Sequence, residues 1–462
     1  MAVFLPDLSD RIHHVKQQSR QFLKDKVLFG NEPSPELTAI LLVYFVQGIL
    51  GLARLAVSFF LKDDLGLSPA QVSALMGIAA LPWVVKPLFG FMSDGLPIFG
   101  YRRRPYLILA GLLGAGSWLS LALVVNTAWA ATVAIALNSL SVAISDVIVD
   151  SLVVERARKE SVAKAGSLQS VSWGASALGG LLTAYFSGVL LEYFSTHVVF
   201  GITAVFPLIV TLVAGLIAET PIQSSSEWAV VARQVKQLKD AIRQPAIWMP
   251  TAFLFLWQAT PSSDSAFFFF ITNDLGFQPE FLGRVRLVTS MAALLGIWMF
   301  QRFFKSVPFR TIFFWTTIAS TLLGLTTLLL VTHANRTIGI DDQWFSLGDS
   351  LILTVLGEIA FMPVLVLAAR ICPAGIEATL FALLMSVSNL AGLVSHELGA
   401  LLTAWLGITE SNFQNLWILV VITNFSTLLP LPLLRWLPED QQAIASESPE
   451  PTPEVAVVSS QT

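Results

Sequence analysis

Long apolar runs constrain the fold of this chain more than any other feature of its sequence. The hydrocarbon core of a bilayer is about 30 Å thick and is crossed by about 20 helical residues. Only 13% of the 462 residues are charged, against roughly 25% in soluble domains. We therefore predict an all-α membrane protein with twelve transmembrane helices. The predicted spans are residues 37–61, 69–92, 105–125, 128–152, 166–190, 198–218, 247–272, 281–302, 309–332, 346–369, 375–405 and 413–437.

The composition excludes several functional classes. The net charge is -4 and the basic residues fall in short clusters between apolar runs, so no continuous basic face is present for nucleic acid. The single cysteine, Cys372, excludes an internal disulfide framework and a cysteine metal cage. The five histidines form no metal-binding His-Glu-x-x-His pair, and no nucleotide loop occurs. We expect neither an enzyme nor a bound cofactor or metal.

The basic residues predict the orientation of the spans. Lys and Arg are enriched in the cytoplasmic loops of membrane proteins. With the N-terminus inside, only Lys62 and Arg336 fall in outer loops, so the bias favours twelve spans with both termini cytoplasmic. Residues 1–36 are then a cytoplasmic segment, and residues 219–246 are a polar cytoplasmic linker. Residues 438–462 are rich in Pro, Glu, Ser and Thr, and we expect a disordered cytoplasmic tail there.

Two sequence repeats relate the halves of the chain. Residues 64–69 (DLGLSP) recur as residues 274–279 (DLGFQP), and residues 178–185 (LGGLLTAY) recur as residues 398–405 (LGALLTAW). Both matches fall in corresponding places of a layout of six spans plus six. This arrangement resembles the major facilitator superfamily, which has two pseudo-symmetric six-helix bundles around a central site. The predicted bundles are residues 37–218 and 247–437.

The loop between the second and third predicted spans resembles a cytoplasmic signature of that superfamily. Residues 90–105 contain a glycine, a spaced aspartate and paired arginines. We expect a gating latch that breaks when the bundles rock. A simpler interpretation, a basic anchor at the membrane surface, explains the arginines but not the aspartate. The predicted latch residues, including the cytoplasmic end of the fourth span, are Gly90, Asp94, Arg102, Arg103, Asp150, Glu155 and Arg156.

Ionisable residues inside the predicted spans are candidates for transport chemistry, because each costs at least ~2.5 kcal/mol at a helix centre. Arg54 and Asp264 are separated by the same 210 positions as the loop repeat, so pseudo-symmetry places them at equivalent positions. They are expected to bind substrate or gate the cavity; a permanent ion pair is the alternative. Asp146 is a candidate for proton or substrate contact. Glu358 has only apolar neighbours and is our first candidate for proton coupling.

Further polar and aromatic side chains complete the candidate substrate site. Arginines near one end of the eighth predicted span are placed to meet an anion, and buried amides can bond to the edge of a heterocycle. Aromatic rings can stack on such a ring, although most aromatic residues in membrane proteins serve packing or interface roles. These candidates are Arg284, Arg286, Gln47, Gln169, Trp257, Gln258 and Asn389.

Three segments resemble the folate-biopterin transporter family. They are residues 146–158 (DVIVDSLVVERAR), residues 93–105, and residues 48–56 (GILGLARLA). The resemblance covers about residues 37 to 437. Among the members of the family, the cyanobacterial and plastid ones are the most similar. It implies a carrier of folates or pterins that works by alternating access.

The resemblance assigns expected roles to the candidate residues. Arg54, or Arg284 with Arg286, would hold the carboxylates of a folate, and Asp264 or Asp146 would hold the pterin. Proton symport would use Glu358 or Asp264. The expected setting is a monomer in a plasma (inner) membrane or a chloroplast envelope, bound only to substrate, proton and lipid. Alternatives are a carrier of another organic anion or a sugar, or a pigment-assembly protein that transports nothing.

Overall fold

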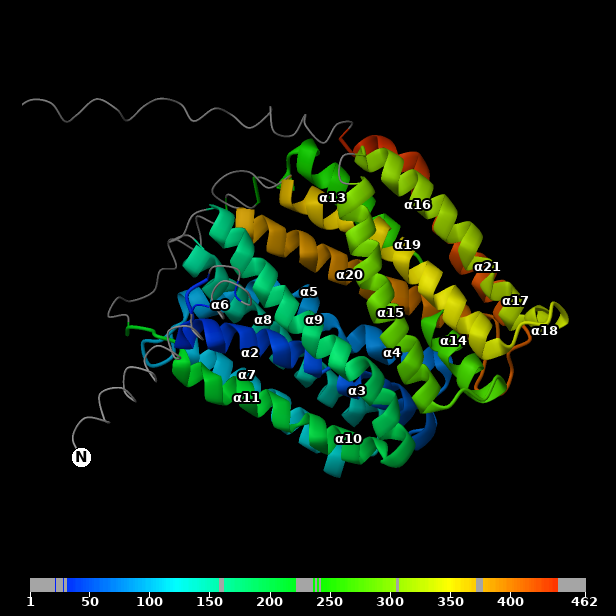
Figure 1. Ribbon diagram of the computed structural model, residues 1–462, viewed down its shortest axis with the longest axis horizontal. Coiled ribbons are helices and arrows are strands. Elements are labelled where there is room, and N and C mark those ends of the chain that lie inside the picture. The colour runs from blue at the N-terminus through cyan, green and yellow to red at the C-terminus, as the bar shows by residue number, and fades with distance from the viewer. Residues whose placement is uncertain are drawn as a thin grey trace, which may run out of the picture. The chain divides into compact units, whose positions relative to one another are not determined.

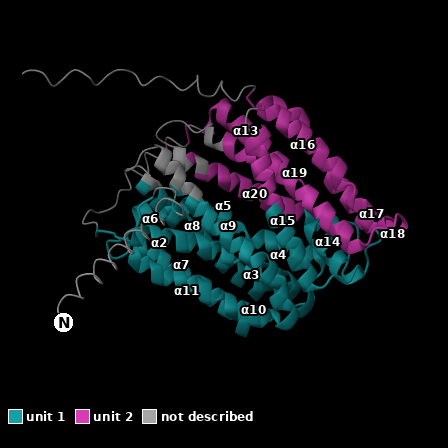
Figure 2. Ribbon diagram, viewed as in Figure 1, with its two compact units in different colours: residues 1–229, 263–291, 399–415 teal, residues 230–262, 292–398, 416–462 magenta. Residues whose placement is uncertain are grey.

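The computed structural model describes residues 31–157, 162–221, 242–304, 307–370 and 377–438, with five isolated positions elsewhere. Most of the predicted segment 1–36, most of the linker 219–246 and nearly all of the tail 438–462 lie outside the described residues, as does Cys372. The chain forms two compact units (Figure 2). Unit 1 is Met1–Ala229, Ser263–Met291 and Gly399–Asn415, and unit 2 is Val230–Ser262, Ala292–Leu398 and Leu416–Thr462.

The described part of each unit is helical (Figure 1). The α-helices of unit 1 are α2 (Pro35–Ile49), α3 (Leu52–Phe59), α4 (Pro69–Ala79), α5 (Leu81–Val84), α6 (Lys86–Gly95), α7 (Arg104–Leu123), α8 (Ala128–Ala157), α9 (Val162–Tyr193), α10 (Thr196–Thr203), α11 (Val205–Val213) and α14 (Asp264–Phe269). Those of unit 2 are α13 (Pro245–Gln258), α16 (Phe309–Gly324), α17 (Thr327–Val331), α18 (Ala334–Thr337), α19 (Asp342–Arg370) and α21 (Leu416–Ser426). Two helices contribute residues to both units, α15 (Pro279–Met299) and α20 (Glu377–Trp405).

Ten helical stretches among the described residues are long and apolar enough to cross a membrane. They are Pro35–Asp64, Pro69–Gly95, Arg104–Leu123, Ala128–Val153, Val171–Tyr193, Thr196–Leu216, Pro279–Phe304, Phe309–Val331, Asp342–Leu367 and Leu416–Trp436. Each matches a predicted span closely. The predicted span 247–272 is divided between α13 and α14, and the predicted span 375–405 is the continuous helix α20. The count of twelve therefore stays a prediction.

Large apolar side chains on these helices are exposed. Leu109, Leu212 and Leu401 are 55%, 76% and 67% exposed, and Trp129 is 72% exposed. Extensive apolar exposure of this kind is unfavourable in water, whereas acyl chains solvate it. Because helices satisfy their own backbone hydrogen bonds, the described architecture is compatible with lipid as its solvent.

The repeat around residues 64–69 and 274–279 extends to irregular local structure. A π-helical turn, Phe60–Asp64, ends the first predicted span, and a second, Phe270–Asp274, occupies the equivalent place in the repeat. Each is followed by a left-handed glycine, Gly66 at φ 61° and Gly276 at φ 67°, a conformation that L side chains rarely adopt. Thus the two sequence copies fold in the same irregular way.

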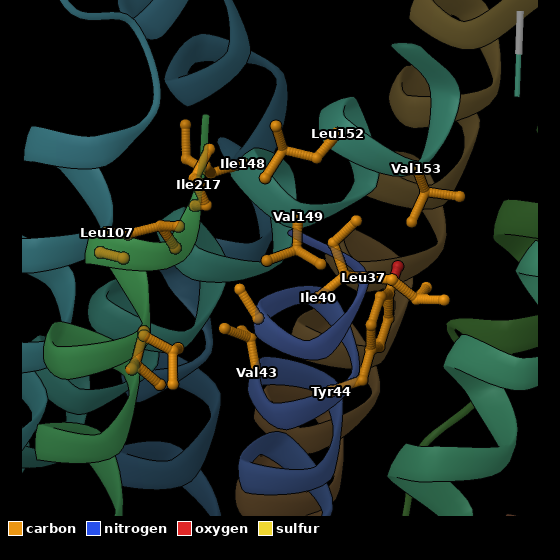
Figure 3. Close-up of a cluster of buried hydrophobic side chains, with 14 of the residues drawn as sticks. Leu37, Ile40, Val43, Tyr44, Leu107, Ile148, Val149, Leu152, Val153 and Ile217 are labelled. Atoms are coloured by element: carbon orange, nitrogen blue, oxygen red, sulfur yellow. The ribbon is translucent and has the colours of Figure 1, made fainter. Parts of the chain in front are cut away.

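Helix α2 packs tightly in unit 1, beside α8 and α9 (Figure 1). In Figure 3, Ile40 and Val43 of α2 point toward Val149 of α8, and these side chains belong to one buried apolar cluster. The backbones of α2 and α9 touch at a pair of glycines. A Cβ atom on Gly48 would lie 2.0 Å from the Ser176 carbonyl oxygen, and one on Gly179 would lie 2.4 Å from the Phe45 carbonyl oxygen. This packing fixes the position of the polar residues at the end of α2.

Candidate functional site

Two carboxylates share one ammonium group inside unit 1. Lys86, the first residue of α6, forms an ion pair with Asp146 of α8 and approaches Asp150 at 3.4 Å. The two aspartates lie one helical turn apart and therefore share a face of α8. Tyr44 of α2 donates its hydroxyl hydrogen to Asp150. The Lys86 ammonium also lies 5.7 Å from the centre of the Trp83 ring. We call Lys86, Asp146 and Asp150 the lysine cluster.

Gln47 adds an unsatisfied donor beside the lysine cluster. Its side-chain amide lies next to Asp146, and its Nε2 atom is buried and forms no hydrogen bond with any described residue. Buried polar atoms are nearly always paired in folded proteins. Because the Gln47 amide also interacts with the Asp146 carboxylate, it can donate either to that carboxylate or to a ligand.

Two arginines with no acidic partner form the second polar feature of unit 1. Arg54 of α3 is exposed although the residues beside it, Ala53 and Leu55, are buried. Arg286 of α15 donates from Nη1 to the Gly51 carbonyl oxygen and to Ser187 Oγ, each at 3.2 Å.

Arg286 contacts the chain at Gly51, three residues before Arg54. Neither forms an ion pair with another described residue, so this arginine pair, Arg54 and Arg286, carries uncompensated positive charge. Carboxylates are the natural complement of such a pair.

Two helices cross closely at a pair of glycines, and this crossing positions the arginine pair. Helices α9 and α15 meet at Gly188 and Gly283, where a Cβ atom on Gly188 would lie 2.3 Å from the Pro279 carbonyl oxygen. Ser187 is adjacent to Gly188 on α9, so the crossing brings the arginine of α15 to its hydroxyl acceptor.

The structure places the other two charged candidates of unit 1, Arg284 and Asp264, at exposed positions. Arg284 pairs with Glu280 at 2.5 Å, one turn earlier on α15, and its side chain is 58% exposed. Its charge is therefore compensated, and we propose Arg286 rather than Arg284 as the anion-binding arginine. Asp264 is the exposed first residue of α14. Arg54 and Asp264 do not form the ion pair that was the alternative interpretation of their symmetric placement.

The remaining candidates whose side chains are described belong to unit 2. Trp257 Nε1 donates to Thr317 Oγ1 at 3.0 Å. Gln258 Oε1 accepts from Ser388 Oγ at 2.5 Å, while its Nε2 atom is buried without a described partner.

Glu358 of α19 sits where α15 crosses, because a Cβ on Gly296 would lie 2.7 Å from its Cβ. Asn389 is half-buried on α20. The side chain of Gln169 lies outside the described residues. The roles expected for these residues stay predictions.

Several predicted latch residues come together around Arg103. Its guanidinium contacts Asp94 at 2.9 Å, Glu155 at 2.7 Å and Ser93 Oγ at 2.7 Å. The Arg103 side chain is only 9% exposed. All four residues belong to unit 1, so Asp94 pairs with an arginine of its own unit rather than one from a neighbouring bundle.

Other predicted latch residues have different surroundings. Asp150 contacts Tyr44 and Lys86, which favours placing it in the lysine cluster. Arg156 donates to Ser34 Oγ at 2.7 Å and ties the end of α8 to the start of α2. Gly90 does not mark a close helix crossing, because a Cβ there would meet Val147 at 3.6 Å, an ordinary contact.

Glu219 stabilises the loop that precedes α7. Its carboxylate accepts hydrogen bonds from the backbone N–H groups of Arg102, Arg103 and Arg104 at 2.5 to 3.2 Å. A carboxylate at a helix N-terminus satisfies N–H groups that lack helical partners.

We expect Arg103→Gln to lower the stability of the folded protein by about 1–3 kcal/mol, because a buried cation that satisfies two carboxylates is lost. The thermal melting temperature of the detergent-purified protein measures this effect. Arg104→Gln is the matched control, since the side chain of Arg104 donates to the Gly215 carbonyl oxygen at 3.3 Å and lies 5.8 Å from the centre of the Tyr101 ring, but pairs with no carboxylate among the described residues. Equal melting temperatures for the two variants would contradict the expectation.

The sequence interpretation missed Lys86, Tyr44 and Glu219. A lysine within the second predicted span and two aspartates within the fourth are a signal for mutual pairing, because intramembrane charges are rarely left without a partner. That signal indicates that the charges pair, but it does not say which aspartate contacts Lys86. No comparable signal marked Glu219, whose role depends on a loop conformation.

Comparison with known structures defines the class of protein. The chain is similar to the nucleoside transporter NupG, with a TM-score of 0.62 and 15% identity over 87% of this chain and 98% of that one. It is likewise similar to a D-xylose-proton symporter, with a TM-score of 0.64 and 15% identity over 87% and 98% of the respective chains. These similarities show that the chain has the fold of these proteins, and they confirm the predicted fold class, an all-α membrane protein of the major facilitator fold.

Sequence comparison identifies the family. Residues 47–454 match the BT1 family, and the chain belongs to this family. It is 63% identical to the folate-biopterin transporter of Synechocystis sp. over 91% of this chain and 85% of that protein. It is 31% identical to folate transporter 2 of Plasmodium falciparum over 87% and 88% of the two chains. The probable folate-biopterin transporter 2 of Arabidopsis thaliana is 32% identical over 86% and 81%.

Proposed function

We propose that this protein carries folates and related pterins across a membrane by alternating access. Family membership supports the substrate class, because the relatives named above are folate or folate-biopterin transporters. The structural observation that carries the proposal is the arginine pair, Arg54 and Arg286. Two cations on membrane-crossing helices that have no acidic partner among the described residues are expected to bind an anionic ligand.

The chemistry of a folate fits the polar residues of unit 1. Its glutamate end carries carboxylates, which guanidinium groups bind through paired, charge-assisted hydrogen bonds. Its pterin end carries amino and ring N–H donors, for which the exposed carboxylate of Asp264 is an acceptor. Gln47 offers a buried donor for the same edge. In unit 2, the unpaired Nε2 of Gln258 and the ring of Trp257 are further contacts proposed for the substrate.

The proposal also covers the ion that drives transport and the membrane in which the protein lies. We propose proton symport, for which the carboxyls expected from the sequence are Glu358 and Asp264. The protein would act as a monomer in a plasma membrane or a chloroplast envelope, with both termini on the cytoplasmic or stromal side. The positive-inside distribution of Lys and Arg supports this orientation.

Counterflow in proteoliposomes tests the substrate class. Vesicles loaded with unlabelled folic acid should take up radiolabelled folic acid, and external biopterin should compete. Vesicles without protein are the control. Counterflow of a sugar or of a simple dicarboxylate, with no exchange of folic acid or biopterin, would overturn the proposal and favour another substrate. Co-purifying pigment without any exchange would instead favour a role in pigment assembly.

A further inference from the structure

The lysine cluster carries one surplus negative charge. Asp146 and Asp150 together contribute two negative charges and Lys86 one positive charge. The side chains of Lys86 and Asp146 are 16% and 14% exposed, and all three residues lie on helices assigned to the membrane. A net charge on helices that are long and apolar enough to cross a membrane is costly, and a single added proton removes it. A permanent structural ion pair would need only one carboxylate for one ammonium group.

Within the part of the chain that the structure describes, the neighbours of the cluster do not cancel that surplus charge. The charged groups that face Asp146 are Lys86 and Asp150, and the amide of Gln47 is its other polar neighbour. Tyr44 approaches from α2 as a neutral donor to Asp150. The indole of Trp83 lies near Lys86 and adds no formal charge. Farther along α8, Glu155 is held by Arg103.

The two carboxylates differ in access to water. The side chain of Asp150 is 43% exposed, whereas that of Asp146 is 14% exposed. Because both contact Lys86 and lie one turn apart on α8, a proton that reaches Asp150 has a short route to Asp146. After protonation, one carboxylate still pairs with Lys86 and the other is a neutral acid that can donate a hydrogen bond.

One polypeptide segment connects the lysine cluster with the arginine pair. Helix α2 supplies Tyr44 and Gln47 to the cluster and ends at Ile49. After the short break, α3 begins at Leu52 and carries Arg54. Arg286 donates to the carbonyl oxygen of Gly51, within this break. A change of protonation in the cluster and a change of anion at the arginine pair therefore both act on the same helix interruption.

We propose that the lysine cluster is the proton-coupling site, and that it binds one proton for each substrate carried. This inference rests on the proposed transport function and assigns its coupling to Asp146 and Asp150 rather than to Glu358 or Asp264. The step is a simple protonation: one proton adds to a carboxylate of the cluster on one side of the membrane and leaves it on the other.

Gradient-driven uptake and gradient-free counterflow, measured on the same full-length protein in proteoliposomes, test the proposal. The probe is radiolabelled folic acid, with the membrane potential clamped at zero and the outside one pH unit more acidic. Coupling to one proton should give the wild type about tenfold more accumulation than without the gradient, since one pH unit is a factor of ten in proton activity. Asp146→Asn imitates the protonated cluster and should retain counterflow while its accumulation ratio falls to about one.

The control is Asp349→Asn in unit 2, because Asp349 is a membrane-embedded carboxylate that accepts from Thr326 at 2.6 Å and Thr327 at 2.8 Å. This variant should accumulate folic acid as the wild type does. If Asp146→Asn does not give a folded protein by thermal melting, Asp150→Asn makes the same charge change and decides the question.

Three outcomes would overturn the coupling proposal: normal accumulation by both aspartate variants, loss of accumulation by Glu358→Gln with Asp146→Asn unaffected, or a sodium gradient as the driving force. Absence of wild-type counterflow would instead remove the proposed function itself.

Discussion

Arg286→Gln is expected to weaken folic acid binding and transport by about 10- to 100-fold, because an ionic hydrogen bond to a carboxylate contributes roughly 1.5–3 kcal/mol. The expected loss is selective. Biopterin has a pterin ring but no glutamate, so its transport should fall much less than that of folic acid. Competition by each compound against radiolabelled folic acid, and direct counterflow of each, measure the difference.

Arg284→Gln is the matched control for the Arg286 variant. The two arginines are two positions apart on α15, yet Arg284 pairs with Glu280 and is exposed, whereas Arg286 reaches Gly51 and Ser187. The control should transport folic acid at nearly the wild-type rate. An equal loss in both variants, or an equal loss of folic acid and biopterin transport by Arg286→Gln, would show that Arg286 does not recognise the glutamate.

Gly179→Val is expected to destabilise the protein by about 3 kcal/mol or more, at the upper end of the range for overpacking. The new Cβ would lie 2.4 Å from the Phe45 carbonyl oxygen and 3.0 Å from the Ile49 backbone nitrogen. Both are backbone atoms of α2, so no side chain can rotate away, and the helices must separate. Thermal melting and the yield of monodisperse protein in detergent measure the loss.

Gly174→Val provides the comparison for this steric effect. Gly174 lies on the same helix, α9, and a Cβ there meets no atom within 4 Å. The same amino-acid change therefore alters helix propensity and side-chain volume equally at both positions, but creates a clash at only one. Similar melting temperatures for the two variants would mean that α2 and α9 are not in backbone contact.

The features that could be predicted from the sequence are those set by local patterns. Apolar runs located ten membrane-crossing helices within a few residues, because span length follows from bilayer thickness. The repeat of 64–69 at 274–279 marked two segments that fold alike. The predicted span 247–272 was less accurate, because Ala259 to Ser263 interrupt the helix between α13 and α14.

The features that could not be predicted depend on which helix faces which. Asp150 lies near cations at the end of α8 in the sequence, and only the packing of α2 and α6 against α8 shows that it contacts Tyr44 and Lys86. Arg284 and Arg286 are the same type of residue and lie at nearly the same position along α15. They have different partners because they point in different directions around the axis of α15. The sequence alone did not determine which of these directions faces α3 and α9.

The π turns at Phe60–Asp64 and Phe270–Asp274 affect the direction in which the side chains before each turn point relative to the loop after it. Such a turn accommodates one more residue than an α-helical path would, and each residue advances a helix by about 100°. If residues 60–64 followed a regular α-helical path instead, Arg54 would therefore be rotated by roughly a quarter turn relative to Gly66 and the loop that follows. The π turn thus sets the direction in which that arginine faces relative to the loop.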